Sequence, residues 1–515
     1  MKFTLNRESL GQRKKLFRYF LPTSLALFIF GYGNIAPVVA AGPEAHLKGE
    51  FGTLHSWPLV PVHMTLMPDG RVFAAGPKVG KTLKYTIWNP SLGTGSSAFE
   101  TLPNTTITNI FCAGQALIPK EGQALILGGD TTTLIPGTNN GYHVSDVNIF
   151  DPVTNMLMPQ NAMAYDRWYA TAVTLTNGEH LTLGGRSVRP YLDVVAEYSP
   201  IPEIRAADGS WRTLSTAASD NAYGKNGISW SYPRAWVNPQ GNVFIVAPNG
   251  TMFKLDPSGT GAITQYIKKI PAGRNSLPSV MFSPGRILAI QKNRATYVVD
   301  INGTGEPTSS SGGSLAKDRQ YSNATVLADG RVWVNGGSST GNDLVGAALD
   351  SEIWNPGTKT WTTAASAATV RLYHSAALLL PDGTVLTGGG GIPGPVKQLN
   401  GEVYYPPYLF MTDGSGEFAP RPEITHAPTA IIGWNQEFTI EATESISRVT
   451  LVRSGAVTHA FNNEQRFLEL PLLQAGSTVT VHSPASANIA PPGYYLLFVW
   501  NASGVPSVAK FVQLG

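Results

Sequence analysis

The chain has 515 residues, which is more than one small domain needs and fits two or three domains. Only 14% of the residues are charged, whereas 10% are aromatic and glycine and proline number 54 and 38. This composition excludes coiled coils, helical repeats and disordered chains, and it is typical of an all-β protein with short strands and many turns.

Residues 1–41 predict a secretory signal peptide or an N-terminal anchor. Basic residues including Arg13, Lys14 and Lys15 precede the apolar stretch 20–30, and small residues follow it up to Ala41. We expect cleavage rather than anchoring, because the apolar stretch contains Pro22 and is short for a membrane span. The protein is therefore expected to be secreted or held in the cell envelope, with membrane contact only if the leader is retained.

The positive formal charge of the chain comes from this leader. The leader carries six basic residues and one acidic residue, so the rest of the chain has 31 basic and 33 acidic residues against totals of 37 and 34. No basic patch indicates a nucleic-acid partner, and none is expected.

A repeated pattern fills the predicted propeller domain, residues 42–417. The recurring pattern is an apolar strand, a tight turn, a second apolar strand that ends near Gly-Gly in the clearest copies, and an aromatic-x-Pro turn, with 281–304 as a degraded copy. Seven units of about 54 residues result, close to the ~50 residues of a Kelch repeat. We predict a seven-bladed Kelch-like β-propeller whose blades open with the innermost strand. The copies are found at 64–90, 115–152, 171–200, 235–257, 281–304, 324–361 and 376–406.

The pattern stops before the predicted C-terminal domain, residues 418–515. This segment holds short alternating strands at a spacing that predicts an immunoglobulin-like β-sandwich. The single cysteine, Cys112, lies outside it, so a disulfide-stapled sandwich is excluded. Taken alone, Cys112 is more simply interpreted as a small buried hydrophobic residue than as a reactive one.

Two segments contain residue types that could bind a metal. Tyr373 and His374 open the seventh copy, His459 lies in the C-terminal domain, and Tyr169 occupies the equivalent place in the third copy. Imidazole and phenolate together suit Cu(II) better than zinc or calcium. Neighbours in a regular strand face opposite ways, so Tyr373 and His374 can meet one ion only if the backbone leaves the strand there. The alternative is a Tyr/His pair that is hydrogen-bonded in the propeller core.

The chain resembles the copper-radical oxidases, the family of galactose oxidase and glyoxal oxidase. The resemblance covers nearly all of the chain after the leader, and its motifs occur in the order that the family shows. They are Phe111-Cys112-Ala113-Gly114, Arg167-Trp168-Tyr169, Arg371-Leu372-Tyr373-His374-Ser375, Thr458-His459 with Asn462-Asn463-Glu464-Gln465-Arg466, and Pro491-Pro492-Gly493-Tyr494-Tyr495 with Val505-Pro506-Ser507.

The resemblance implies a role for each site residue. Cys112 would form a thioether with the ring of Tyr169, which would bind one copper ion and hold a tyrosyl radical. His374 and His459 would be the imidazole ligands, and Tyr373 would be the axial ligand and the base. The implied reaction is the two-electron oxidation of small aldehydes or primary alcohols with O2 to hydrogen peroxide, by a protein expected to be a monomer.

Finer features of the sequence narrow the resemblance. Arg-Trp-Tyr before the third-copy strand and Pro-Asp-Gly after Tyr373 and His374 resemble the glyoxal oxidase branch more than galactose oxidase. Trp57 and Trp230 are candidates for the ring that shields the radical, and His63 is a candidate channel residue with a structural role preferred. The competing hypothesis is a non-catalytic Kelch propeller that serves as a carbohydrate-binding or adhesion scaffold, but it leaves the five site residues unexplained.

Overall fold

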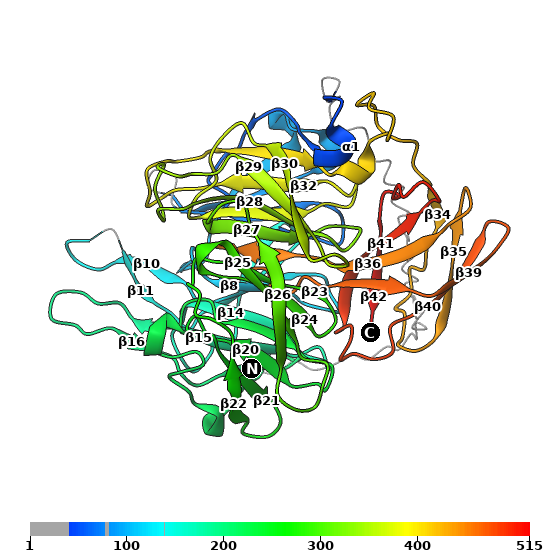
Figure 1. The fold of residues 1–515 in the computed structure, drawn as a ribbon. Helices are drawn as coiled ribbons and strands as arrows, with labels where there is room; N and C mark the ends of the chain where they lie inside the picture. The colour runs from blue at the N-terminus through cyan, green and yellow to red at the C-terminus, as the bar shows by residue number, and fades with distance from the viewer. Residues whose placement is uncertain (1–40, 78–81, 139) are drawn as a thin grey trace, which may run out of the picture.

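The computed structural model describes residues 41–77, 82–138 and 140–515. Strands make up nearly all of its regular structure (Figure 1). The seven-bladed propeller and the C-terminal sandwich predicted from the sequence are confirmed. The predicted leader lies outside the described residues except for Ala41, and the domain boundary at 417/418 stays a prediction. Within the described ranges, no helix is long and apolar enough to cross a membrane.

Each blade is an antiparallel sheet whose strands follow one another in the chain. Blades 1 and 2 contain β3 (His63–Leu66), β4 (Val72–Ala75), β5 (Lys84–Trp88), β6 (Phe99–Pro103), β8 (Gly114–Leu117), β9 (Ala124–Leu127), β12 (Val147–Asp151) and β13 (Met156–Gln160). Blades 3 and 4 contain β14 (Trp168–Thr174), β15 (His180–Val188), β16 (Glu197–Tyr198), β17 (Glu203–Arg205), β18 (Trp211–Thr213), β19 (Arg234–Val237), β20 (Val243–Val246), β21 (Thr251–Asp256) and β22 (Ala262–Lys269).

Blades 5 to 7 repeat the arrangement, and the chain start closes the ring. Blades 5 and 6 contain β23 (Ser279–Ser283), β24 (Arg286–Ile290), β25 (Ala295–Asp300), β26 (Thr308–Ser314), β27 (Gln320–Val326), β28 (Val332–Ser338), β29 (Asp350–Asn355) and β30 (Thr360–Ser366). Blade 7 contains β31 (Ser375–Leu379), β32 (Val385–Gly389) and β33 (Asn400–Tyr405), completed by β1 (Glu50–Phe51) and β2 (His55–Ser56). The first blade-forming strands of the chain thus hydrogen-bond to the last blade.

Short elements lie outside the blades. A small sheet of β7 (Thr108–Asn109), β10 (Asp130–Leu134) and β11 (Gly141–His143) projects from blade 2, at the left of Figure 1. The helices are α1 (Ala45–Lys48) and the 3₁₀ turns Pro90–Leu92, Ser96–Ala98, Ser215–Ala217, Asn226–Ile228, Lys292–Arg294 and Pro407–Leu409. Each of them is only three or four residues long, so the core consists mainly of sheet packed on sheet.

The apolar core lies between neighbouring blades. One cluster joins blades 3 and 4 through the fully buried residues Leu181, Leu183, Val243 and Ile245. Inner strands such as β3, β8 and β31 are buried on both faces. Their first residues lie around the central axis, where the site residues are found.

Three buried ion pairs fix the loops that precede inner strands. Arg167, Arg319 and Arg371 each stand two residues before a tyrosine, and each binds a glutamate of the third strand of its blade, at 2.9–3.0 Å. The same guanidinium groups donate to the carbonyl oxygens of Gly184, Gly336 and Gly389, within the Gly-Gly segments. The glutamates are Glu203, Glu352 and Glu402. In these three blades, the Gly-Gly segment therefore supplies a carbonyl oxygen that binds the arginine of an Arg-x-Tyr loop.

We expect Glu203→Gln to lower the free energy of unfolding by about 3–5 kcal/mol, because it leaves Arg167 buried without a carboxylate. Glu352→Gln is the matched control and should cost clearly less, since Arg319 keeps Asp350 at 3.2 Å. Urea unfolding of the copper-free proteins, followed by tryptophan fluorescence, measures both. Equal losses would contradict the assignment of the cost to an unpaired buried guanidinium.

The C-terminal domain packs two four-stranded sheets face to face. One consists of β34 (Ile424–His426), β35 (Glu437–Ala442), β40 (Thr478–His482) and β39 (Leu472–Ala475), and the other of β38 (Phe467–Leu470), β36 (Arg448–Arg453), β41 (Gly493–Trp500) and β42 (Lys510–Leu514). Ile440, Val449, Leu497 and Val499 are fully buried between them. The strand β37 (Ala456–Thr458) leaves this domain and pairs with β3 of blade 1.

Polar contacts hold this inserted segment inside the propeller. Gln115 of blade 2 donates to Val457 O at 2.6 Å, and Gln465 accepts the Val326 N–H of blade 6 at 3.1 Å. Glu464 accepts from the backbone and the hydroxyl of Thr174 in blade 3. The orange segment that enters the propeller in Figure 1 therefore carries His459 to the axis through contacts with several blades.

Candidate metal centre

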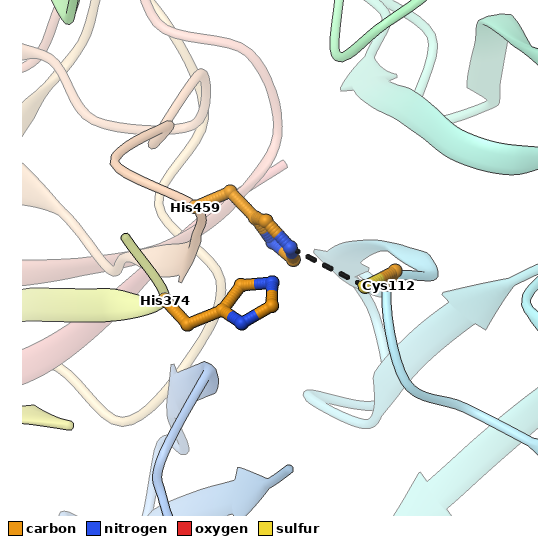
Figure 2. Close-up of side chains that lie close together, drawn as sticks. All are labelled: Cys112, His374 and His459. Atoms are coloured by element: carbon orange, nitrogen blue, oxygen red, sulfur yellow. Dashed lines mark hydrogen bonds between the residues drawn. The ribbon is translucent and has the colours of Figure 1, made fainter. Parts of the chain in front are cut away.

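Five side chains that are distant in the sequence converge at the propeller axis. One ligand atom each from Cys112, His374 and His459 lies within 4.8 Å of the others (Figure 2). The phenol oxygens of Tyr169 and Tyr373 are in hydrogen-bond contact with each other. The rings of Tyr169 and Tyr373 lie 4.8 and 5.6 Å from the His459 ring. All five residues selected from the sequence thus lie in one cluster.

The backbone at the site adopts a conformation that L residues rarely use. The φ angles of Cys112, Tyr169, His374 and His459 are 62°, 70°, 68° and 49°. His374 stands in a turn just before β31, so the chain has left the strand where Tyr373 and His374 meet, as the sequence argument required. Such positions cost of order 1–3 kcal/mol each and gather at functional sites. The surrounding blades fix these turns and point the side chains inward.

The hydrogen bonds of the two histidines leave a nitrogen available for a metal. His374 Nδ1 is 2.8 Å from Gly391 O and must donate to it, which leaves Nε2 as a lone-pair acceptor. This Nε2 is buried and has no hydrogen-bond partner. His459 Nδ1 contacts the Thr458 hydroxyl at 2.6 Å, and its Nε2 lies 3.3 Å from Cys112 Sγ. A buried imidazole nitrogen with no hydrogen-bond donor beside it has the properties of a metal ligand.

Burial sets the protonation of the site. It lowers the pKa of His374 to about 4 and that of His459 well below its usual value, where His374 and His63 add to the effect. Both imidazoles are therefore neutral, which is the form that binds metals. Burial also raises the pKa of Tyr169 and Tyr373, so these phenols ionise only when a nearby cation compensates. Two neutral imidazoles and two phenols form the N,O donor set that Cu(II) prefers.

The surroundings include residues that the sequence argument missed. Trp168 stacks on Tyr169 with ring centroids 3.7 Å apart and planes 18° apart. Tyr321 lies against Tyr373 at 5.0 Å and follows the buried Arg319 in the same Arg-x-Tyr pattern. That recurring triplet was the available signal for Tyr321. Nothing local predicted this contact of Trp168, because neighbours in a regular strand face opposite ways, whereas Tyr169 has a positive φ of 70°.

The two tryptophans proposed to shield Tyr169 have different outcomes. The Trp230 ring is nearly parallel to that of Tyr169, with centroids 6.0 Å apart, so it is farther from Tyr169 than the Trp168 ring is. Trp57 is wrong, because it packs against Trp88 and Phe99 at 5.8 and 5.1 Å, outside the ring cluster of the site. Its apolar ring is used in the junction of blades 7 and 1 instead.

His63 lies beside the centre in a structural position. Its Nε2 accepts the backbone N–H of Cys112 at 2.9 Å, and its ring is 5.9 Å from that of His459. It therefore fixes the unusual backbone at Cys112 and does not join the cluster of ligand atoms.

Known proteins are similar to this chain in sequence and in fold. Residues 421–514 match the family described as the galactose oxidase-like, Early set domain. A galactose oxidase of Gibberella zeae is 28% identical over 504 residues, covering 90% of this chain and 70% of the relative. An aldehyde oxidase of Vitis pseudoreticulata is 24% identical, covering 80% of this chain and 83% of the relative. The chain is thus similar to these oxidases over most of its length.

A solved structure shows the same fold as this chain. A fungal alcohol oxidase, determined in complex with copper, superposes with a TM-score of 0.79 at 22% identity. The match covers 91% of this chain and 99% of the other. The predicted fold is thus confirmed, and so is the predicted resemblance to galactose oxidase and to aldehyde oxidases.

Proposed function

We propose that this oxidase binds one copper ion through Tyr169, Tyr373, His374 Nε2 and His459 Nε2, and that Cys112 is joined by a thioether to the Tyr169 ring. The observation that carries the proposal is the buried, partnerless His374 Nε2 beside a second neutral imidazole and two phenols. The proximity of Cys112 supports the cross-link: its carbonyl accepts the Tyr169 N–H at 3.0 Å, and both side chains belong to one buried cluster.

The cross-link would give the site a second one-electron store. When bound, copper supplies one electron-accepting centre and acidifies a hydroxyl placed beside it. The oxidised Tyr169 supplies the other, and the attached sulfur would spread its unpaired electron and lower its potential. Burial under Trp168 and Trp230 keeps water from the oxidised ring.

Tyr373 and Tyr169 divide the chemistry on the substrate. The Tyr373 oxygen accepts the substrate hydroxyl proton, for which its half-buried position beside Tyr169 is suited. The Tyr169 oxygen takes the hydrogen atom from the adjacent carbon. Dioxygen then takes up two electrons and two protons and leaves as hydrogen peroxide, so that an alcohol gives an aldehyde, or a hydrated aldehyde gives an acid.

We propose small aldehydes or primary alcohols as substrates, with the glyoxal oxidase branch preferred. Half-buried rings of Phe111, Trp168, Trp230 and Tyr373 border the centre and suit a small, partly apolar molecule. The protein is further proposed to be exported and monomeric.

A peroxide-coupled assay tests the function. Copper-loaded protein should release hydrogen peroxide with at least one of glyoxal, methylglyoxal, glycerol, benzyl alcohol or galactose, and the copper-free protein should not, because only the loaded centre has two electron-accepting sites. Bound copper with no peroxide from any of these substrates would favour a binding role and contradict the proposal.

A further inference from the structure

Two arginines lie against the indole that covers Tyr169. The guanidinium carbon of Arg186 is 4.5 Å from the Trp168 ring centroid, and that of Arg189 is 5.1 Å from it. Trp168 in turn stacks on Tyr169 at 3.7 Å. The ring in closest stacking contact with Tyr169 is therefore itself in contact with two positive charges.

The blades hold Arg186 in this position. Arg186 is the cross-strand partner of Trp168 in the pairing of β14 with β15, and it follows the Gly-Gly of blade 3. Asp130 follows the Gly-Gly of blade 2 and anchors His143, whose Nδ1 lies 2.7 Å from its carboxylate. His143 Nδ1 therefore donates to Asp130, and its Nε2 accepts from Arg186 Nε at 3.1 Å.

The charges in this cluster do not cancel. Asp130 is also bound by Arg189, at 2.7 Å, so a single carboxylate faces two guanidinium groups. Burial lowers the pKa of His143 more than Asp130 raises it, so the imidazole is neutral and adds no charge of its own. Arg186 has no carboxylate partner among the described contacts. One net positive charge remains beside the Trp168 ring.

The indole nitrogen of Trp168 has no means of losing its proton. Trp168 Nε1 is buried and makes no hydrogen bond. Transfer of one electron from Trp168 to the oxidised Tyr169 would reduce the tyrosine to its phenolate and leave the indole as a radical cation. Such a cation is normally relieved by loss of the Nε1 proton, for which the described residues offer no hydrogen-bonded acceptor, and it would stand next to two guanidinium groups.

We propose that Arg186 is a positioning residue that confines the oxidised state to Tyr169 by making the oxidation of Trp168 unfavourable. The stacked indole can then exclude water from Tyr169 without becoming a path by which the unpaired electron escapes. This proposal rests on the proposed function, because it requires a radical on Tyr169.

Radical lifetime tests the proposal in the copper-loaded protein without substrate. Wild type, Arg186→Gln and Arg186→Lys are oxidised with ferricyanide, and the radical is followed by absorbance and by electron paramagnetic resonance with ring-deuterated tryptophan. We expect Arg186→Gln to shorten the lifetime on the order of ten-fold, since it removes a charge 4.5 Å from the indole, and Arg186→Lys to retain most of it. The Trp168 peptide of Arg186→Gln should also gain oxygen, and copper content should be unchanged in both variants.

The outcomes separate this proposal from the proposed function. A wild-type radical with an equal lifetime in Arg186→Gln overturns the role of Arg186 and leaves the proposed function intact. A lifetime in Arg186→Lys as short as that in Arg186→Gln also overturns it, because charge would then not be the cause. The absence of any radical in copper-loaded wild type overturns both.

Discussion

His459→Ala is expected to yield a folded protein that no longer retains copper. His459 is the only proposed ligand from the C-terminal domain, and its side chain is not part of the apolar cluster that joins blades 3 and 4. Mutation of a residue that only hydrogen-bonds to a metal ligand typically lowers metal affinity about 10–100-fold. Because His459 would be a ligand itself, we expect its loss to lower copper affinity by more than about a hundredfold. Copper titration by calorimetry measures the affinity, and circular dichroism checks the fold.

The thermal stability of the same variant gives a second measurement. A metal at a hundred times its Kd stabilises the folded state by about 2.7 kcal/mol. Copper should therefore raise the melting temperature of the wild type and have no such effect on His459→Ala. His482→Ala is the matched control, because His482 is exposed in the same domain. Full copper occupancy in His459→Ala would show that the inserted segment does not supply a ligand.

The fold could be predicted because its signals are local. Turn residues recur in every blade and Gly-Gly segments near the end of the second strand in four of them, and each copy contains strands that pair within its own sheet. The closing strands Glu50–Phe51 and His55–Ser56 were not predicted, because two-residue strands carry no periodicity and their partner, β33, lies some 350 residues away. The strand Ala456–Thr458 was likewise hidden, since it pairs outside its own domain.

The site was predicted only where a residue type itself implies chemistry. A lone cysteine, two tyrosines and two histidines could be selected from the chain, and the structure brings them together. Trp168 and Arg186 could not be selected, because their effect depends on a positive φ at Tyr169 and on the register of β14 with β15. Such information resides in the backbone geometry and the pairing, and neither residue carries it alone.

Aerobic copper loading is expected to remove two hydrogen atoms from the wild-type protein as the thioether forms between Cys112 and Tyr169. The Cys112 thiol is fully buried, and burial raises its pKa well above the usual value, so it is unreactive until a metal or an oxidised neighbour activates it. Intact mass measures the loss. After denaturation, the processed wild type should no longer react with iodoacetamide, whereas copper-free protein should react fully.

Cys112→Ser is the variant that isolates the contribution of the cross-link. It removes the sulfur but none of the four proposed ligands, so copper should still bind. Without sulfur on the ring the oxidised Tyr169 is harder to form, and we expect kcat/KM to fall on the order of 10²–10³-fold, or about 3–4 kcal/mol. Tyr169→Phe separates the two roles of the tyrosine, because it should lose copper affinity as well as the mass change. A wild-type thiol that stays freely alkylatable after copper exposure, with peroxide production unaffected in Cys112→Ser, would mean that the second electron comes from elsewhere.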